Sequence, residues 1–156
     1  DLQSFRKIGI NRLSIGFQSL DPEFLTLLTR WHNPDDCVTM YKNARDAGFE
    51  NISIDMLYNI PGQSVDGWLN DLKAIVEMQP EHIAIYSLTA EKGTPFYADI
   101  QNGVFALPSS ALENEMYKEG SQFLRGRGFI ISHIFDTKIY LKRVPYFCIS
   151  PLEIAF

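Results

Sequence analysis

Two segments of the chain alternate large apolar residues with small or polar ones, which is the pattern of a β-strand with one buried face. They span residues 11–18 and 51–58. Their apolar positions are Leu13, Ile15 and Phe17 in the first segment and Ile52, Ile54 and Met56 in the second. Short apolar runs predict two more strands, at residues 82–88 and 129–134.

Helix signals fill the segment between the first two predicted strands. Asp21-Pro22 and Asn33-Pro34 each combine a capping side chain with a proline, which suits the first position of a helix. Apolar residues follow each pair at helical spacing. We expect Gly48 to end the second of these helices, because the backbone needs a positive φ there.

Two further helices are predicted downstream. Ser64 is a candidate N-cap for the first, and Ser110 with Glu113 forms a capping box for the second. The segment between the third strand and Ser110 carries Gly93, Pro95 and Gly103, and we predict a loop there. Strands and helices therefore alternate, which is typical of βα units around a parallel sheet.

The polar faces of the first two strands favour one kind of parallel sheet. A strand buried on both faces reads as a continuous apolar run, whereas these strands each have one small, polar face. The pattern predicts an α/β fold, and within it a partial (β/α) TIM-like barrel with parallel strands and a ligand inside. A solvated antiparallel sheet would show the same alternation, but the βα order argues against it. Barrel chemistry sits at the C-terminal ends of strands, and Gln18 and Asp55 lie at or near these ends.

Composition and charge narrow the function classes. The chain has 156 residues and a net charge of -5. Its cations are scattered apart from Lys138, Lys142 and Arg143, which we interpret as a solvated surface, so no nucleic-acid partner is expected. No apolar run approaches the roughly 20 residues of a transmembrane helix, so no membrane span is expected either. Cys37 and Cys148 are isolated and form no disulfide framework, which fits a reducing, cytoplasm-like compartment.

Three segments, in order along the chain, carry a resemblance to a known family. They read Asn-Arg-Leu-Ser-Ile-Gly-Phe-Gln-Ser-Leu at 11–20, Asn-Ile-Ser-Ile-Asp-Met-Leu-Tyr-Asn-Ile-Pro-Gly-Gln at 51–63, and Tyr-Ser-Leu-Thr-Ala-Glu-Lys-Gly-Thr-Pro at 86–95. Together they resemble the central barrel of the oxygen-independent coproporphyrinogen III oxidase family of radical S-adenosylmethionine (SAM) proteins. The third segment is most similar to the haem-chaperone, HemW-type branch of that family. The resemblance runs from about Gly9 to about Phe129.

The resemblance implies three cofactor-binding residues and no catalytic or metal-binding ones. By motif position, Gln18 and Asp55 hold the SAM ribose, and Arg30, twelve residues after Gln18, pairs with the SAM carboxylate. The residue types suit these roles, because amides and carboxylates bind a diol and the planar guanidinium binds a carboxylate. Without the resemblance, Gln18 would be a turn residue and Arg30 a surface cation at a helix end.

The chain departs from the family pattern in its cysteines and in one turn. The C-x3-C-x2-C loop that holds a [4Fe-4S] cluster is absent, and we interpret Cys37 as a packed core thiol. The resemblance therefore implies a cluster only in an intact, longer parent, and we expect no radical chemistry from this chain alone, which leaves its status as an enzyme open. Asn59 stands where the family has a glycine in Tyr-Gly-Leu-Pro-Gly. Asparagine tolerates the left-handed conformation, so we expect the turn to form.

The resemblance divides the chain into two parts and leaves several functions open. Residues 1–129 are interpreted as the central part of a radical SAM barrel, and residues 130–156 as a divergent tail of unknown role. The implied functions are a haem chaperone, an oxygen-independent coproporphyrinogen III oxidase, or a truncated product without function whose open barrel edges promote association. The implied small-molecule partners are SAM and haem or a porphyrinogen. The implied compartment is the cytoplasm, or a mitochondrion or plastid in a eukaryote.

Overall fold

The computed structural model describes residues 1–135 and 138–143, which form one five-stranded sheet and its covering helices. The elements in chain order are α1 (Leu2–Lys7), β1 (Leu13–Gln18), α2 (Pro22–Leu27), α3 (Pro34–Asp46), β2 (Ile52–Tyr58), α4 (Val65–Glu77), β3 (His82–Ser87), α5 (Pro95–Gln101), α6 (Ser110–Gly126), β4 (Phe129–Phe135) and β5 (Lys138–Arg143). The strand order is β1-β2-β3-β5-β4.

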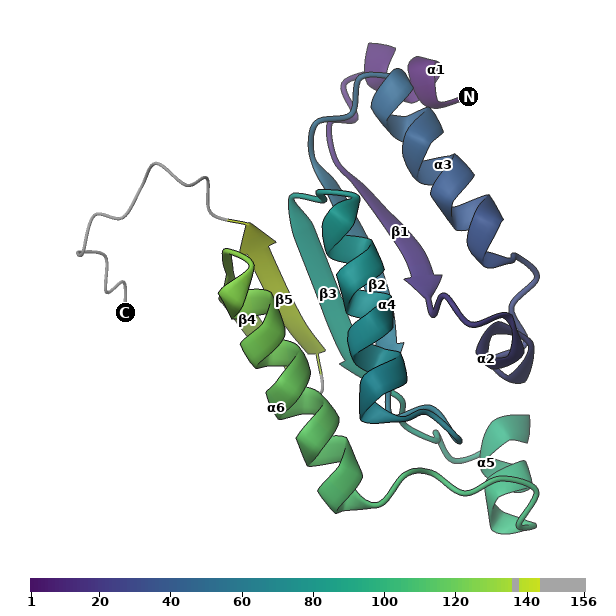
Figure 1. The fold of residues 1–156 in the computed structure, drawn as a ribbon. Coiled ribbons are helices and arrows are strands. Elements are labelled where there is room, and N and C mark those ends of the chain that lie inside the picture. The colour runs from purple at the N-terminus through teal and green to yellow at the C-terminus, as the bar shows by residue number, and fades with distance from the viewer. Residues whose placement is uncertain (136–137, 144–156) are drawn as a thin grey trace.

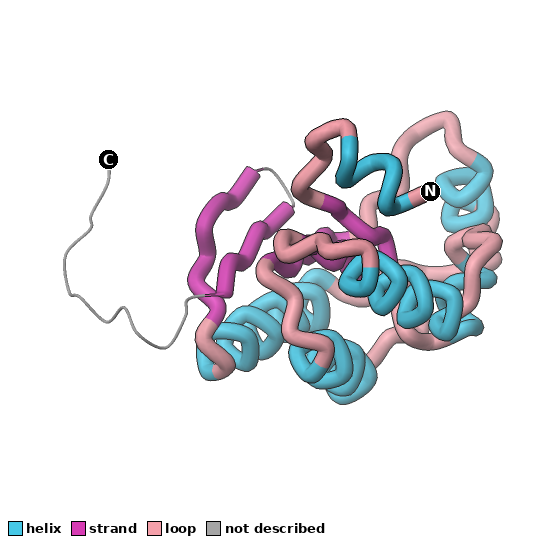
Figure 2. Tube along the Cα trace, turned by 90° about the horizontal axis from the view of Figure 1, so that it is seen from above, coloured by secondary structure: helices cyan, strands magenta, loops and turns pink. Residues whose placement is uncertain are grey.

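The first three strands run parallel, as the βα order predicted. Ile54 of β2 pairs with Ile15 of β1 on one side and with Ile83 of β3 on the other. The helices α3, α4 and α6 cover one face of the sheet (Figures 1 and 2). The apolar positions of β1 and β2 enter the core under these helices, and Phe17 and Ile54 are fully buried. This burial confirms the predicted apolar and polar faces of both strands.

The predicted helix starts are confirmed at three places. Asp21 accepts a hydrogen bond from Glu23 N at 2.8 Å at the start of α2. Asn33 forms a capping box with Asp36 at the start of α3, and Ser64 accepts from Gly67 N at the start of α4. Each cap satisfies a backbone N–H that has no partner inside the helix.

Two predictions in the second half of the chain were wrong. The segment after β3 is not all loop, because Thr94 caps the short helix α5 and Pro95 occupies its first position. The cap of α6 is Ser109, one residue earlier than predicted, and its hydroxyl accepts from Leu112 N at 3.3 Å. Ser110 is therefore the first residue inside the helix, and no capping box with Glu113 forms.

Beyond β3 the sheet is no longer parallel. The predicted fourth strand forms as β4, but β5 lies between it and β3 and pairs antiparallel with both. Leu141 of β5 is fully buried in the core, whereas Lys142 is exposed. The predicted solvated surface of the three cations is thus confirmed for Lys142, which lies on a paired strand.

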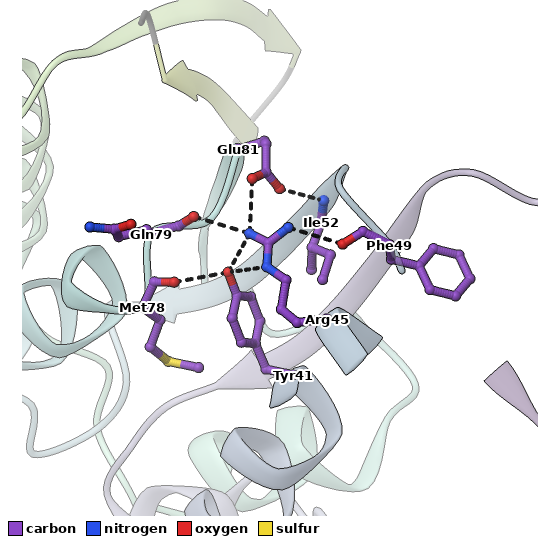
Figure 3. A network of polar contacts seen from close by, with 7 residues as sticks. All are labelled: Tyr41, Arg45, Phe49, Ile52, Met78, Gln79 and Glu81. Atoms are coloured by element: carbon purple, nitrogen blue, oxygen red, sulfur yellow. Dashed lines mark hydrogen bonds and ion pairs between the residues drawn. The ribbon is translucent and has the colours of Figure 1, made fainter. Parts of the chain in front are cut away.

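The N-terminal ends of the strands are joined by a network around Arg45, the last basic residue of α3 (Figure 3). Its guanidinium donates to Glu81 Oε1 at 2.8 Å, and the other Glu81 oxygen accepts from Ile52 N at 2.9 Å. The remaining contacts of this Arg45 network go to the Tyr41 hydroxyl and to the carbonyls of Phe49 and Gln79. Each carboxylate oxygen of Glu81 therefore has a donor.

Candidate functional site

A cavity of about 320 Å³ opens at the C-terminal ends of β1, β2 and β3, and it brings the three predicted site residues together. Gln18, Arg30 and Asp55 all line it, although they lie on different elements. The other lining residues are Leu57, Tyr86, Ser87, Leu88 and Thr89. Their binding roles stay a prediction, but the placement that the sequence implied for them is met.

Gln18 reaches the cavity from a tight turn at the end of β1. Ser19 N donates to Phe17 O at 2.8 Å, and Gln18 between them has φ +67°, a conformation that costs a residue with a side chain about 1 kcal/mol or more. The Gln18 side chain folds over Gly16, where an added Cβ would collide with Gln18 Nε2. Gly16 therefore leaves room for this glutamine on the cavity side of the strand.

Asp71 of α4 anchors the turn that carries Gln18. Its Oδ2 accepts from Ser19 Oγ at 3.0 Å and from Leu20 N at 3.1 Å. Burial raises the pKa of the Asp71 carboxyl, although the bonds from Leu20 and Ser19 oppose this change. Sequence analysis missed this residue because the two partners are about fifty positions away and no local pattern links them.

Arg30 lies just past the end of α2, not within the helix. Thr29 ends the helix with φ +54°, and Arg30 N donates to Leu25 O at 2.9 Å, which is the bonding of a Schellman motif. The side chain of Arg30 is exposed at the cavity. Among residues 1–135 and 138–143 it has no hydrogen bond or ion pair, so all its guanidinium donors are available to a ligand.

Asp55 projects from the polar face of β2 and is only half-buried. Its Oδ1 accepts from the hydroxyls of Ser14 at 2.8 Å and Ser53 at 3.4 Å. Burial raises the pKa of the Asp55 carboxyl, while these hydroxyls and the charge of Arg12 lower it. No cation lies within ion-pair distance in the described part of the chain, so a carboxylate oxygen is left to accept from a ligand.

The wall of the cavity at the end of β3 was not predicted. It is formed by Ser87, the last residue of β3, and by Leu88 and Thr89, which follow it. Leu88, Thr89 and Arg30 also border a second cavity of about 380 Å³, which reaches the stacked rings of Phe96 and Phe105. The Thr94-Pro95 start signal of α5 was the available clue to this region, since α2 and α5 lie together beyond the strand ends (Figure 1).

The thiol of Cys37 is a core group, as its helical position predicted. It is 5% exposed, and burial raises its pKa to about 11, which disfavours the thiolate that binds metals. Cys148 lies outside the described residues. Residues 1–135 and 138–143 contain no group of three His, Cys, Asp or Glu side chains that could hold a metal ion. Every helix in these ranges is too short or too polar to cross a bilayer.

His32 is half-buried beside this site. Its Nε2 lies 3.4 Å from the carbonyl oxygen of Phe17 at the end of β1. The ring therefore packs the loop after Arg30 against the turn that carries Gln18.

Sequence comparison places this chain within a known family. The Radical SAM superfamily model matches residues 1–75, which include all three predicted site residues. The mouse "Radical S-adenosyl methionine domain-containing protein 1, mitochondrial" is 39% identical over 128 residues, 82% of this chain and 29% of the mouse protein. The "Heme chaperone HemW" of Bacillus subtilis is 36% identical over 117 residues, 75% of this chain and 31% of the bacterial protein. The chain belongs to the radical SAM coproporphyrinogen oxidase-like family, in its HemW branch.

The solved structures agree with this family and with the TIM-like fold. The coproporphyrinogen III oxidase HemN from Escherichia coli, described as a radical SAM enzyme, superposes with a TM-score of 0.76 at 26% identity. The match covers 91% of this chain and 32% of that structure. This chain therefore spans about a third of the length of the radical SAM family members that it resembles.

Proposed function

We propose that this chain binds SAM in the cavity at the C-terminal ends of β1, β2 and β3, as part of a protein of haem metabolism. The observation that carries the proposal is the convergence of Gln18, Arg30 and Asp55 on one cavity. Arg30 has its guanidinium free, and Asp55 has hydroxyl donors but no cation. These are the states in which each group can take up a ligand.

The donors and acceptors of the cavity match the polar groups of SAM. Arg30 binds the carboxylate of the methionine part, because its planar fork matches a carboxylate. Asp55 and Gln18 bind the ribose hydroxyls, which would supply the pairing that a buried carboxylate needs. When bound beside a [4Fe-4S] cluster in intact family members, SAM supplies radical chemistry. The described residues of this chain supply binding and orientation.

Titration calorimetry of the chain with SAM tests the proposal. Arg30→Ala is expected to weaken SAM binding roughly 30-fold, because a charge-assisted hydrogen-bond pair is lost. Asp55→Asn is expected to weaken it less, since an amide still accepts one ribose hydrogen bond. Arg125→Ala is the control, as Arg125 is an exposed cation at the far end of α6. Equal SAM affinity for Arg30→Ala and Arg125→Ala would contradict the assignment.

We further propose that the protein acts as a haem chaperone, with a porphyrinogen oxidase as the second candidate. The names of the HemW relatives support the first, and the structural match to HemN supports the second. Haem titration of the chain separates them: a stoichiometric Soret shift favours the chaperone. Anaerobic conversion of coproporphyrinogen by a full-length protein containing this chain favours the oxidase. A disordered proton spectrum of the chain would favour the third alternative, a product without function.

The cellular compartment is also proposed from the names of the relatives. The mouse relative is named as mitochondrial, whereas the bacterial relatives have no such compartment in their names. We propose a reducing compartment, either the cytoplasm or a mitochondrion, in line with the two isolated cysteines of the sequence.

A further inference from the structure

Asn59 begins the turn after β2, at the position where the family has glycine. Its φ is +67°, so the left-handed conformation that a glycine would adopt is kept. The expected turn therefore forms. Unlike glycine, however, this residue places a side chain in the interior, and Asn59 is only 4% exposed.

The Asn59 side chain crosses from β2 to the segment after β3. Its Nδ2 donates to Ser87 Oγ at 3.3 Å and to Leu88 O at 3.2 Å. Ser87 Oγ in turn donates to Glu113 Oε1 on α6 at 2.6 Å. The amide thus joins the turn after β2 to the strand end and, through the serine, to a covering helix.

Both of the residues that accept these bonds line the proposed SAM cavity, while Asn59 does not. The wall is also tied to β2 by a backbone bond from Leu88 N to Tyr58 O at 2.9 Å. That bond engages the N–H of Leu88. The Asn59 amide engages the carbonyl of the same residue.

We infer that Asn59 is a positioning residue for the cavity: its amide sets the wall at Ser87, Leu88 and Thr89 against which the ligand packs. This inference rests on the proposed SAM site. Its alternative is that Asn59 only tolerates the turn. The burial of the side chain argues against that alternative. Asn59 Oδ1 is buried without a partner among the described residues, and this burial destabilises the fold in a way that a glycine would avoid. In this inference the two Nδ2 contacts outweigh that destabilisation.

Asn59→Gly tests the inference, because glycine keeps the backbone conformation and removes only the side chain. Gln79→Gly is the matched control: Gln79 has φ +60°, is exposed, and lies at the opposite end of the strands. We expect Asn59→Gly to weaken SAM binding about tenfold by calorimetry, with Gln79→Gly unchanged. We also expect faster amide hydrogen exchange at residues 87–89 in Asn59→Gly, with exchange in β1 unaltered.

The two measurements separate failure of the inference from failure of the proposed function. If the unaltered chain binds SAM and Asn59→Gly binds it equally well, Asn59 is not a positioning residue and the SAM site stands. If the unaltered chain does not bind SAM, the proposed function fails, and hydrogen exchange alone decides whether Asn59 holds the wall. Unchanged exchange at residues 87–89 overturns the inference in either case.

Discussion

The carboxylates at the two ends of the parallel strands differ in their hydrogen-bond and ion-pair partners. At the N-terminal ends, Glu81 has a cation and a backbone N–H on its two oxygens (Figure 3). At the C-terminal ends, Asp55 and Asp71 accept only from hydroxyls and a backbone N–H, and burial raises the pKa of both. The Glu81 carboxylate is paired on both oxygens, whereas the cavity at the other end is lined by the Asp55 carboxylate and by the Arg30 guanidinium, neither of which has an ion pair among residues 1–135 and 138–143.

The backbone shows the same contrast. Four residues other than glycine have a positive φ in the described part of the chain, and three of them, Gln18, Thr29 and Asn59, lie at the C-terminal end. Strained conformations of this kind gather at functional sites, where surrounding contacts hold them. In α/β barrels the C-terminal end carries function and the N-terminal end stability. We propose the same division of the two tasks between the two ends of this sheet.

The largest effect is expected from breaking the Arg45 network. Arg45→Ala removes the donors to Glu81, the Tyr41 hydroxyl and two carbonyls. It should lower the free energy of unfolding by about 2 kcal/mol, since the partly buried Tyr41 hydroxyl and Phe49 carbonyl lose a donor, while the half-exposed Glu81 and the exposed Gln79 carbonyl regain water. Urea denaturation measures this loss. The SAM affinity of the folded variant should not change.

Lys42→Ala is the control for that experiment, because Lys42 is exposed on the same helix. Its effect should stay within about 0.5 kcal/mol. If Arg45→Ala instead left the stability unchanged and weakened SAM binding, the division between the two ends would be wrong.

A smaller effect, dependent on pH, is expected at Asp71. Because the folded pKa of Asp71 is raised above 3.8, the folded chain holds a proton that the unfolded chain has released, and stability is lost as the pH rises through the folded pKa. Asp71→Asn removes this loss. Both bonds of Asp71 go to one oxygen, so the asparagine carbonyl can still accept from Ser19 and Leu20. The variant should gain stability relative to the unaltered chain as the pH rises from about 4.

Urea denaturation of both chains across that pH range measures the difference. A relative loss of stability in the variant with rising pH would mean that Ser19 and Leu20 hold the Asp71 carboxylate charged. The C-terminal end would then resemble the N-terminal end in its electrostatics.

Local patterns in the sequence predicted the part of the fold that local physics determines. The alternation of apolar with small or polar residues predicted β1 and β2 with the correct buried faces. The capping residues Asp21, Asn33 and Ser64 predicted three helix starts. The predicted loop after β3 was wrong because Gly93, Pro95 and Gly103 were all read as loop residues, whereas Thr94 and Pro95 start α5. The place of β5 beside β3 was not predictable, since strand pairing depends on partners far along the chain.

Prediction from the sequence reached only some residues of the candidate site, for the same reason. Gln18, Arg30 and Asp55 were found because a family motif fixes their positions, and the parallel strands then bring them to one cavity. The residues that hold the cavity walls, Asp71 and Asn59, were not assigned such roles, because their partners lie 28 to 52 positions away. Contacts at such separations follow from the tertiary fold alone.

The smallest effect is expected from Gln79→Gly, which compares backbone strain at the two ends. Glycine relieves the positive φ of Gln79 but adds freedom to the unfolded chain, so a net gain of about 0.5 kcal/mol is expected in urea denaturation. The carbonyl of residue 79 still accepts from Arg45. Asn59→Gly relieves the same strain but also loses two hydrogen bonds, so it should be destabilised relative to Gln79→Gly. Equal gains in both variants would show that the left-handed residues differ only in backbone strain, and that the side chain of Asn59 adds nothing to the C-terminal end.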